Sequence, residues 1–152
     1  MSSEDVLEKA NYRYFLDIAT RWMDNDIYGH VNNVTYYSYF DTIANHFLIQ
    51  EGGLKIQGGD IVAFVVASEC QYRSPIAFPG TIQSALRVNK LGNSSVQYGI
   101  AIFKEDEVLA SAFGTFTHVF VERGTNTSVS IPSGIRSSLQ ELVVGSPLER
   151  NF

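Results

Sequence analysis

Cysteine and basic residues are scarce in this chain of 152 residues. Cys70 is the only cysteine, which excludes an intramolecular disulfide and any zinc site built from several cysteines, and which fits a reducing compartment. Lysine and arginine together number 11 against 16 aspartates and glutamates, so the formal charge is −5. No basic field would therefore attract the phosphates of a nucleic acid, and nucleic acid is not an expected partner.

The chain also has no long apolar segment. No run reaches the ~18 apolar residues of a membrane span, and residues 1–10 lack the basic and then apolar order of a signal peptide. We therefore expect a cytoplasmic protein that does not bind a membrane. Its 45% hydrophobic and 18% charged content suits a single globular core at this length. We predict one domain over residues 1–152, with residues 1–10 and about 124–152 as peripheral tails.

What the sequence does contain is a regular order of strand and helix patterns. Residues 12–22 mix aromatic and branched side chains with partial alternation, which favours a strand. Residues 33–50 carry apolar side chains at helical spacing, between a pair of asparagines that suits an N-cap and a pair of glycines. The predicted apolar face of this helix contains Tyr36, Tyr37, Phe40, Ile43, Ala44, Phe47 and Leu48. A short helix after Pro132 is indicated by Ile135, Leu139 and Leu142.

Four further strands are predicted between the two helices. They cover about 60–73, 80–90, 94–104 and 107–122. The last two separators, LGN and EDE, are short enough for antiparallel hairpins, and no helix intervenes to make parallel crossovers. The economical arrangement is an α+β fold in which a curved, mainly antiparallel five-stranded sheet wraps around one long central helix. Strands 80–90 and 107–122 carry apolar residues on more than one face, which favours a second copy of the chain as a partner.

The stretch between the first strand and the long helix concentrates chemically active side chains. It reads RWMDNDIYGHVNN over residues 21–33, with two carboxylates, Asp24 and Asp26, before a glycine, a histidine and two asparagines. Structural roles would explain each of these residues alone, because negative charge is favourable near a helix N-terminus, asparagine is a good N-cap and histidine is often hydrogen-bonded within a fold. The residues by themselves therefore leave structural and catalytic roles open.

The wider pattern D-x-D-x-x-G-H-V-N-N-x-x-Y-x-x-Y-F-D starts at Asp24, and Tyr72, Pro75 and Gly80 follow it in a strand, turn and strand. Over roughly residues 12–122, the chain resembles the 4-hydroxybenzoyl-CoA thioesterase branch of the hotdog-fold acyl-CoA thioesterases. The resemblance implies a hotdog fold, a homodimer or homotetramer, and hydrolysis of an acyl-CoA or acyl-carrier-protein thioester in a tunnel at the dimer interface. It implies no metal and no cofactor other than the CoA of the substrate.

By the same resemblance, Asp26 is the catalytic carboxylate. A carboxylate either attacks a thioester carbonyl itself or deprotonates the attacking water, so Asp26 is a nucleophile or a general base. The carbonyl oxygen gains charge and needs a donor, for which the backbone N–H of Asn33 at the helix start is the candidate. His30 is expected to orient Asp26 or the water. The predicted substrate-binding residues are Gly29, Asn32, Tyr36 and Tyr28.

Other charged residues have different expected roles. Asp24 is expected to be structural, and Asp41, in the middle of the helix, is the reserve catalytic residue. The three histidines share no metal-ligand spacing, so no metal site is predicted. The candidates for contact with phosphates at the mouth of the tunnel are Arg73, Arg87, Lys90 and Lys104.

Two alternative functions stay open at this stage. Hotdog enoyl-CoA hydratases or dehydratases resemble one another in an Asp-x-Asn-Pro-x-His element, but here Asp26 and His30 are one residue closer together and the Asn-Pro pair is absent. A non-catalytic acyl-CoA-binding module is the other alternative, and the presence of Asp26, Gly29 and the asparagine pair argues against it. A serine hydrolase is not supported, because the sequence has no G-x-S-x-G elbow.

Overall fold

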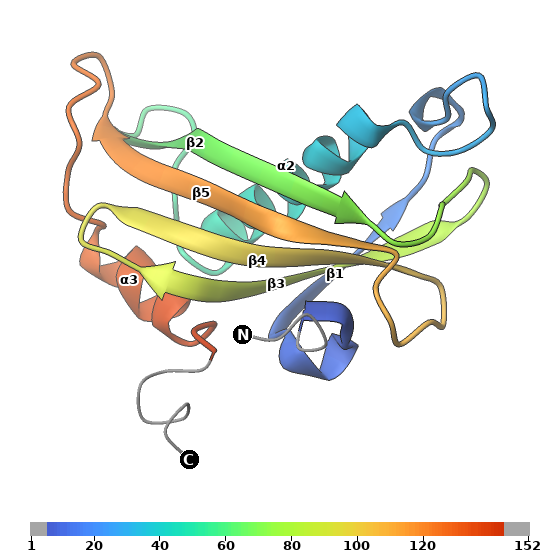
Figure 1. Ribbon diagram of the computed structural model, residues 1–152. Helices are drawn as coiled ribbons and strands as arrows, with labels where there is room; N and C mark the ends of the chain where they lie inside the picture. Colours follow the sequence, from blue (N-terminus) through green and yellow to red (C-terminus); the bar gives the residue numbers. More distant parts are fainter. Residues whose placement is uncertain (1–5, 145–152) are drawn as a thin grey trace.

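The structure of the protein is a computed structural model that describes residues 6–144. Five strands form one sheet in the order β1-β3-β4-β5-β2, in which every neighbouring pair is antiparallel. The expected α+β hotdog fold is confirmed, with the sheet curving around one long helix (Figure 1). The elements in chain order are the 3-10 helix η1 (Lys9–Asn11), β1 (Tyr14–Ala19), the 3-10 helix η2 (Trp22–Asp24), α2 (Asn33–Gln50), β2 (Ile61–Tyr72), β3 (Thr81–Leu91), β4 (Ser95–Lys104), β5 (Ala112–Glu122) and α3 (Ser133–Gln140).

Strand pairing follows the predicted hairpins from β3 to β4 and from β4 to β5. β2 crosses instead to the far side of β5, with Tyr72 opposite Ala112. β5 starts later than the predicted residue 107, because the chain first turns at Asp106, whose φ is 64°. The Ala110 N–H then donates to the Leu7 carbonyl of the N-terminal segment at 2.8 Å. β1 is also shorter than predicted, since η1 precedes it and η2 follows it.

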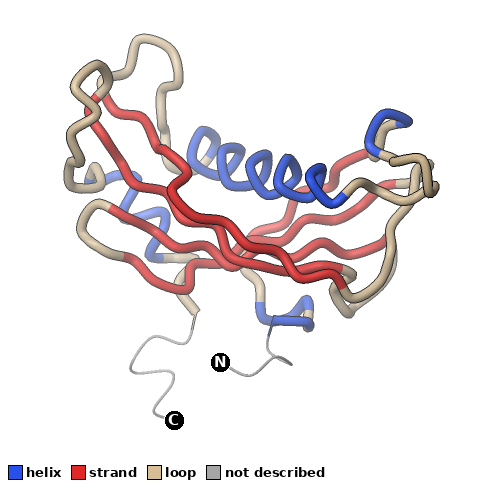
Figure 2. The backbone as a smooth tube through the Cα atoms, turned by 45° about the horizontal axis from the view of Figure 1, so that its top comes forward, coloured by secondary structure: helices blue, strands red, loops and turns tan. Residues whose placement is uncertain are grey.

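Helix α2 has the predicted ends and lies along the concave face of the sheet (Figure 2). Tyr39 is buried, whereas Tyr37, predicted on the apolar face, is only half-buried. The Tyr39 hydroxyl donates to the Asp24 carboxylate at 2.8 Å, and this partner makes the burial of a tyrosine favourable. No helix within residues 6–144 is long and apolar enough to cross a membrane. The buried face of α2 contains Tyr36, Tyr39, Phe40, Ile43, Ala44, Phe47 and Leu48.

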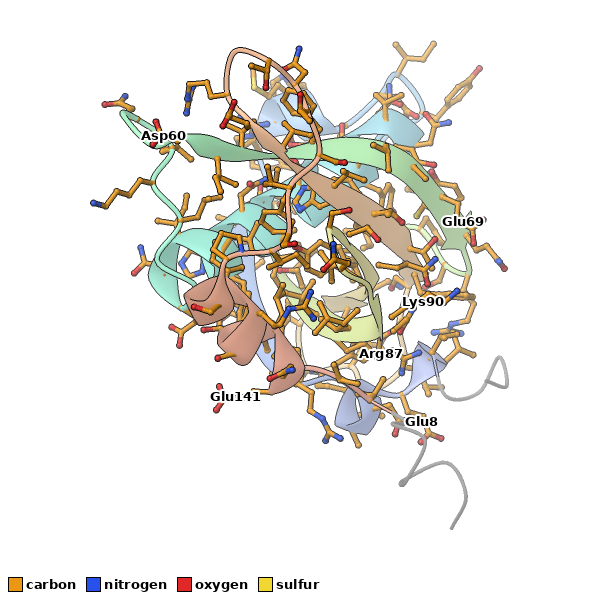
Figure 3. All side chains as sticks on the ribbon, turned by 90° about the vertical axis from the view of Figure 1, so that its left-hand side faces the viewer. Glu8, Asp60, Glu69, Arg87, Lys90 and Glu141 are labelled. Atoms are coloured by element: carbon orange, nitrogen blue, oxygen red, sulfur yellow. The ribbon has the colours of Figure 1, made fainter. Side chains whose placement is uncertain are left out.

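The face of the sheet opposite α2 is partly covered by the N-terminal segment of the same chain. Tyr12 packs edge-on against Phe103 with ring centres 6.1 Å apart, and the Arg87 guanidinium lies 4.8 Å from the centre of the Tyr12 ring. Arg87, labelled in Figure 3, is only 1% exposed. The prediction that Arg87 contacts phosphates at a tunnel mouth is therefore wrong, because its guanidinium is enclosed. Intrachain packing thus covers part of the second apolar face.

The segment after β5 belongs to the main core. α3 confirms the short helix that the sequence predicts in this region. The chain then pairs with β3, since the Val88 N–H donates to the Leu142 carbonyl at 2.9 Å and the Val144 N–H donates to the Val88 carbonyl at 3.1 Å. Residues 131–144 are thus packed against the sheet and do not form the peripheral tail that their polar composition predicts. The buried core residues of this segment include Ile131, Ile135, Leu139 and Leu142.

β2 forms one edge of the sheet and leaves apolar side chains uncovered. Phe64, Val65 and Val66 are 43%, 47% and 58% exposed. The pairing with β5 shifts register around Val66, which marks a bulge in the strand. Figure 3 shows this edge running between Asp60 and Glu69. Natural proteins usually cover or interrupt an apolar edge strand, because its unpaired backbone groups can pair with another chain.

Candidate active site

Residues 24–32 fold back on themselves as a narrow two-stranded ribbon between η2 and α2, which we call the site ribbon. Gly29 forms the turn at its tip with a φ of 83°, and its N–H donates to the Asp26 carbonyl at 3.1 Å. A positive φ is costly for most other residues, which explains the glycine in the motif. Three backbone contacts pair the two arms, namely the Asn32 N–H with the Asp24 carbonyl at 2.8 Å, a bridge between Asn25 and Val31, and the Asp26 N–H with the His30 carbonyl at 2.8 Å.

The site ribbon is attached to the turn between β2 and β3. The Val31 N–H donates to the Ile76 carbonyl at 2.7 Å. The Asn25 side-chain oxygen accepts the N–H of Phe78 at 3.0 Å. These bonds lie on opposite arms of the ribbon, so both arms are fixed against a segment about fifty residues further along the chain.

The N-terminus of α2 follows the ribbon directly. The Asn32 side-chain oxygen accepts the Val34 N–H at 3.2 Å, and its carbonyl accepts the Thr35 N–H at 2.9 Å, so Asn32 is the N-cap. The N–H of Asn33, the first helical residue, has no acceptor within residues 6–144. An unpaired amide at the positive end of a helix is suited to hold an oxygen that gains negative charge.

A hollow of about 560 Å³, which we call the site hollow, opens where the ribbon, the helix start and the end of β2 meet. Asp26, His30 and Asn33, the predicted catalytic residues, all line it, and so does Tyr36, one of the predicted substrate-binding residues. The full lining is Asp26, His30, Val31, Asn33, Tyr36, Tyr72, Arg73, Ser74 and Pro75.

Two tyrosines form an aromatic wall in the site hollow. Tyr36 and Tyr72 pack edge to face with ring centres 5.0 Å apart, and the Tyr72 hydroxyl donates to the Asn33 carbonyl at 3.2 Å. Burial raises the pKa of Tyr36 to about 12, and burial is also the main cause that raises the pKa of Tyr72. Both hydroxyls therefore keep their protons at neutral pH, and the wall is uncharged.

The Asp26 carboxylate is half-buried and has one oxygen available. Its Oδ1 accepts the Tyr28 N–H at 2.8 Å, which holds the side chain at the ribbon tip. Its Oδ2 has no hydrogen-bond donor within residues 6–144. This arrangement suits a carboxylate that must contact water or substrate while its orientation is fixed. Asp24, by contrast, is buried, lies outside the site hollow and has donors on both oxygens.

The other predicted residues lie outside the lining of the site hollow. The Tyr28 side chain is exposed, and Asn32 serves as the helix cap. Asp41 is exposed on α2 and accepts the Asn45 side-chain N–H at 3.0 Å. Gly29 lines a second hollow of about 590 Å³, to which Asp26 also contributes. The remaining residues of this second hollow are Trp22, Met23, Asn25 and Ile27.

Of the two polar residues on the opposite wall, Arg73 and Ser74, the sequence predicts only Arg73. Arg73 lines the site hollow and its Nε donates to the Ala110 carbonyl at 2.7 Å, which anchors one side of the guanidinium. Ser74 lines it too, and its hydroxyl bonds that of Ser111 at 3.0 Å. Arg73 is one of the cations expected to contact phosphates at the tunnel mouth, whereas Ser74 gives no signal in the sequence. Within residues 6–144 no three His, Cys, Asp or Glu side chains are grouped to hold a metal ion.

Comparison with known proteins identifies the family. The family model described as Thioesterase superfamily matches residues 28–111. The PA5185 protein from Pseudomonas aeruginosa is 52% identical, with a TM-score of 0.90 over 92% of this chain and 98% of that one. Slr0204, a 1,4-dihydroxy-2-naphthoyl-CoA thioesterase from Synechocystis, is 14% identical, with a TM-score of 0.76 over 85% of this chain and 96% of its own.

Two further proteins are also similar to this chain. BH1999, a gentisyl-coenzyme A thioesterase, is 22% identical with a TM-score of 0.73 over 83% of this chain and 99% of its own. YsmA of Bacillus subtilis is 20% identical over 88 residues, which is 58% of this chain and 59% of YsmA, less than two thirds of that relative. On the family match, which covers the helix and most of the site hollow, the chain belongs to the thioesterase superfamily and is a thioester hydrolase with the hotdog fold.

Proposed function

We propose that this thioester hydrolase acts on an acyl- or aroyl-CoA and that Asp26 is its catalytic carboxylate. The observation that supports this most is the shared hollow, because Asp26 and His30 from the ribbon and Asn33 from the helix start all line it. Its volume of about 560 Å³ lies within the range of small-molecule sites.

The hydrolysis has two balanced routes. As general base, Asp26 takes a proton from water while the water oxygen attacks the thioester carbonyl; the intermediate then expels the CoA thiolate, which takes up that proton. As nucleophile, Asp26 attacks the carbonyl itself and the thiolate leaves; water then hydrolyses the resulting anhydride to the free acid and Asp26, and a proton of that water passes to the thiolate. In both routes the Asn33 N–H stabilises the carbonyl oxygen as it gains charge. The proposed role of His30, which lines the same hollow, is to orient the water or Asp26. Neither route needs a metal or a cofactor other than the CoA of the substrate.

The lining of the site hollow suits the two parts of such a substrate. The uncharged wall of Tyr36 and Tyr72 offers aromatic contact to a flat acyl group. Arg73 is anchored through Nε and has further N–H groups for an anionic part of CoA or of a carrier-protein phosphopantetheine. Slr0204 and BH1999 are named as thioesterases of aromatic acyl-CoAs, and their similar fold is consistent with an aroyl substrate here.

We also infer that a second copy of the chain completes the site. β2 is an apolar edge strand, and its last residue, Tyr72, lines the site hollow. A chain that pairs along this edge would therefore lie against the hollow and narrow it into a tunnel. The protein is expected to act as a homodimer or homotetramer.

A hydrolysis assay across a panel of aromatic, branched and straight acyl-CoAs, with detection of the free thiol, tests the proposal. Asp26→Asn is expected to lower kcat by at least ~10²-fold, because it removes the proposed base or nucleophile. Its melting temperature should be nearly unchanged, because the Asp26 carboxylate is half-buried and accepts only one backbone hydrogen bond. Asp41→Asn, a matched change on the exposed side of α2, should keep its activity. Loss of turnover in Asp41→Asn with full turnover in Asp26→Asn would move the catalytic role to the helix.

A further inference from the structure

The carboxylate of Asp24 is unusually enclosed for a group outside the site hollow. It is only 1% exposed, and burial of a charge is costly unless donors surround it. Its Oδ2 accepts the Arg21 N–H at 2.9 Å and the Tyr39 hydroxyl at 2.8 Å, and its Oδ1 accepts the Arg21 Nε at 3.2 Å and Nη2 at 3.1 Å. Burial raises the pKa of Asp24, but these donors outweigh it and hold the pKa below its ordinary value, so the group is ionised at neutral pH.

These bonds connect the two parts that carry the proposed catalytic groups. Asp24 is the first residue of the site ribbon, whose tip holds Asp26, and Tyr39 lies in the body of α2, whose first amide is that of Asn33. The ribbon passes directly into the helix at the Asn32 cap, where the Asn32 N–H also donates to the Asp24 carbonyl at 2.8 Å. Asp24 and Tyr39 join the base of the ribbon to the helix about two turns after the helix start.

We propose that the Asp24–Tyr39 hydrogen bond is a positioning contact that sets the location of the Asp26 carboxylate relative to the Asn33 N–H. The proposal rests on the proposed roles of Asp26 and Asn33. The attacking oxygen must approach the carbonyl carbon while the carbonyl oxygen remains at the amide, so a displacement of about 1 Å between the two groups can cost ~10²-fold in rate. Tyr39 acts through Asp26 and contacts no reacting atom.

Tyr39→Phe is the sharpest variant, because it removes one hydroxyl and keeps the buried ring. Asp24 keeps its three bonds from Arg21 in this variant, so its charge still has donors and the fold is retained. Tyr14→Phe is the matched control. The Tyr14 hydroxyl lies 2.7 Å from Nδ1 of His46 and also joins α2 to a neighbouring segment, but neither residue lines the site hollow.

Steady-state kinetics should be measured well below the melting temperature of every variant. Tyr39→Phe is expected to lower kcat by roughly 10- to 100-fold with KM within about twofold of the wild type, because binding surfaces are intact and only alignment is lost. Tyr14→Phe should keep kcat within about twofold. A wild-type kcat in well-folded Tyr39→Phe, or an equal fall in both variants, would overturn the positioning role.

A second experiment distinguishes a failure of this inference from a failure of the proposed function. In an Asp26→Asn background, Tyr39→Phe should cause little further loss of the residual turnover, since the group that it positions is already gone. An undiminished further loss would show that Tyr39 acts by another route and would overturn the proposal. If Asp26→Asn alone is fully active, the proposed function fails first, whatever Tyr39→Phe does.

Discussion

At the scale of single residues, His118 is a titratable group that the sheet holds neutral. Its Nδ1 lies 3.0 Å from the Tyr98 hydroxyl, and both side chains are buried between the sheet and the helices. Burial lowers the pKa of His118 to about 4 and raises that of Tyr98. Tyr98 therefore keeps its proton, and His118 stays uncharged at neutral pH and serves as a hydrogen-bond partner in the core.

This pair predicts a loss of stability in weak acid. In the unfolded chain His118 titrates near its ordinary pKa of 6.5, and in the folded chain near 4. Between these pH values the unfolded state binds more protons than the folded state. The free energy of unfolding is therefore unaffected by the titration of His118 above pH ~6.5 and decreases as the pH falls toward ~4, by at most about 3 kcal/mol. His118→Asn keeps an acceptor for Tyr98 and should flatten this dependence.

Urea unfolding of both proteins from pH ~7 to ~5 measures this effect. Carboxylates titrate in both proteins and cancel in the difference between them, so the difference reports His118 alone. The same slope of unfolding free energy against pH in wild type and His118→Asn would show that the buried histidine is not the cause.

At the scale of elements, the start of α2 can be tested without disturbing the helix. Asn32 has φ of −63° and ψ of 140°, a conformation that the residue before a proline prefers, and proline is favoured as the first residue of a helix. Asn33→Pro should therefore fold while it deletes the one N–H proposed to hold the thioester oxygen. We expect at least a ~10²-fold lower kcat in Asn33→Pro and most of the activity in Asn33→Ala.

The control for this pair of variants is their melting temperature, which should be similar, because the Asn32 cap is present in both. Equal activity in the two folded variants would mean that another donor polarises the carbonyl.

Helix α3 predicts a second effect at this scale. Leu139 is fully buried in the main core, although it belongs to a segment whose polar composition suggests a tail. Leu139→Ala should lower the free energy of unfolding by about 2–5 kcal/mol, the usual cost of such a cavity. Gln140→Ala, on the exposed side of the same helix, should change it by less than about 0.5 kcal/mol. Urea denaturation measures both, and equal small effects would mean that α3 is not part of the cooperative core.

At the scale of the whole molecule, the apolar edge of β2 predicts self-association. We expect at least a dimer by light scattering at micromolar concentration. Val66→Lys places a charge in the exposed part of this edge and should shift the protein toward monomers and reduce its activity. Val108→Lys is the control, since Val108 is similarly exposed but lies in the turn before β5. A monomeric wild type would remove the tunnel from the proposed mechanism.

The sequence predicts the order of elements because each depends on local signals. α2 has an asparagine cap and a glycine pair at its ends, and the hairpins have short polar turns. Residues that are close in the sequence are therefore enough to predict the helix and the hairpins. The site ribbon and the helix start adjoin in the chain, so one continuous motif contains Asp26, His30 and Asn33, for which the resemblance implies the catalytic roles. Ser74 gives no local signal, because it reaches the hollow only through the crossing of β2 to the far side of β5. Arg87 shows the same limit, since its enclosure depends on the folded N-terminal segment.

In the site ribbon, the fold requires particular residue types at some positions and tolerates substitution at others. Its arms are joined by main-chain bonds that almost any residue supplies, and at the tip Gly29, with its positive φ, and Asp26, whose Oδ1 accepts the Tyr28 N–H, depend on residue type. The side chains of Ile27 and Tyr28 are exposed, yet they flank the carboxylate of Asp26. Mutations in these two codons therefore meet little selection from folding while they alter the surroundings of the proposed catalytic carboxylate. A lineage that carries this gene can explore new acyl groups there without first acquiring a stabilising mutation elsewhere.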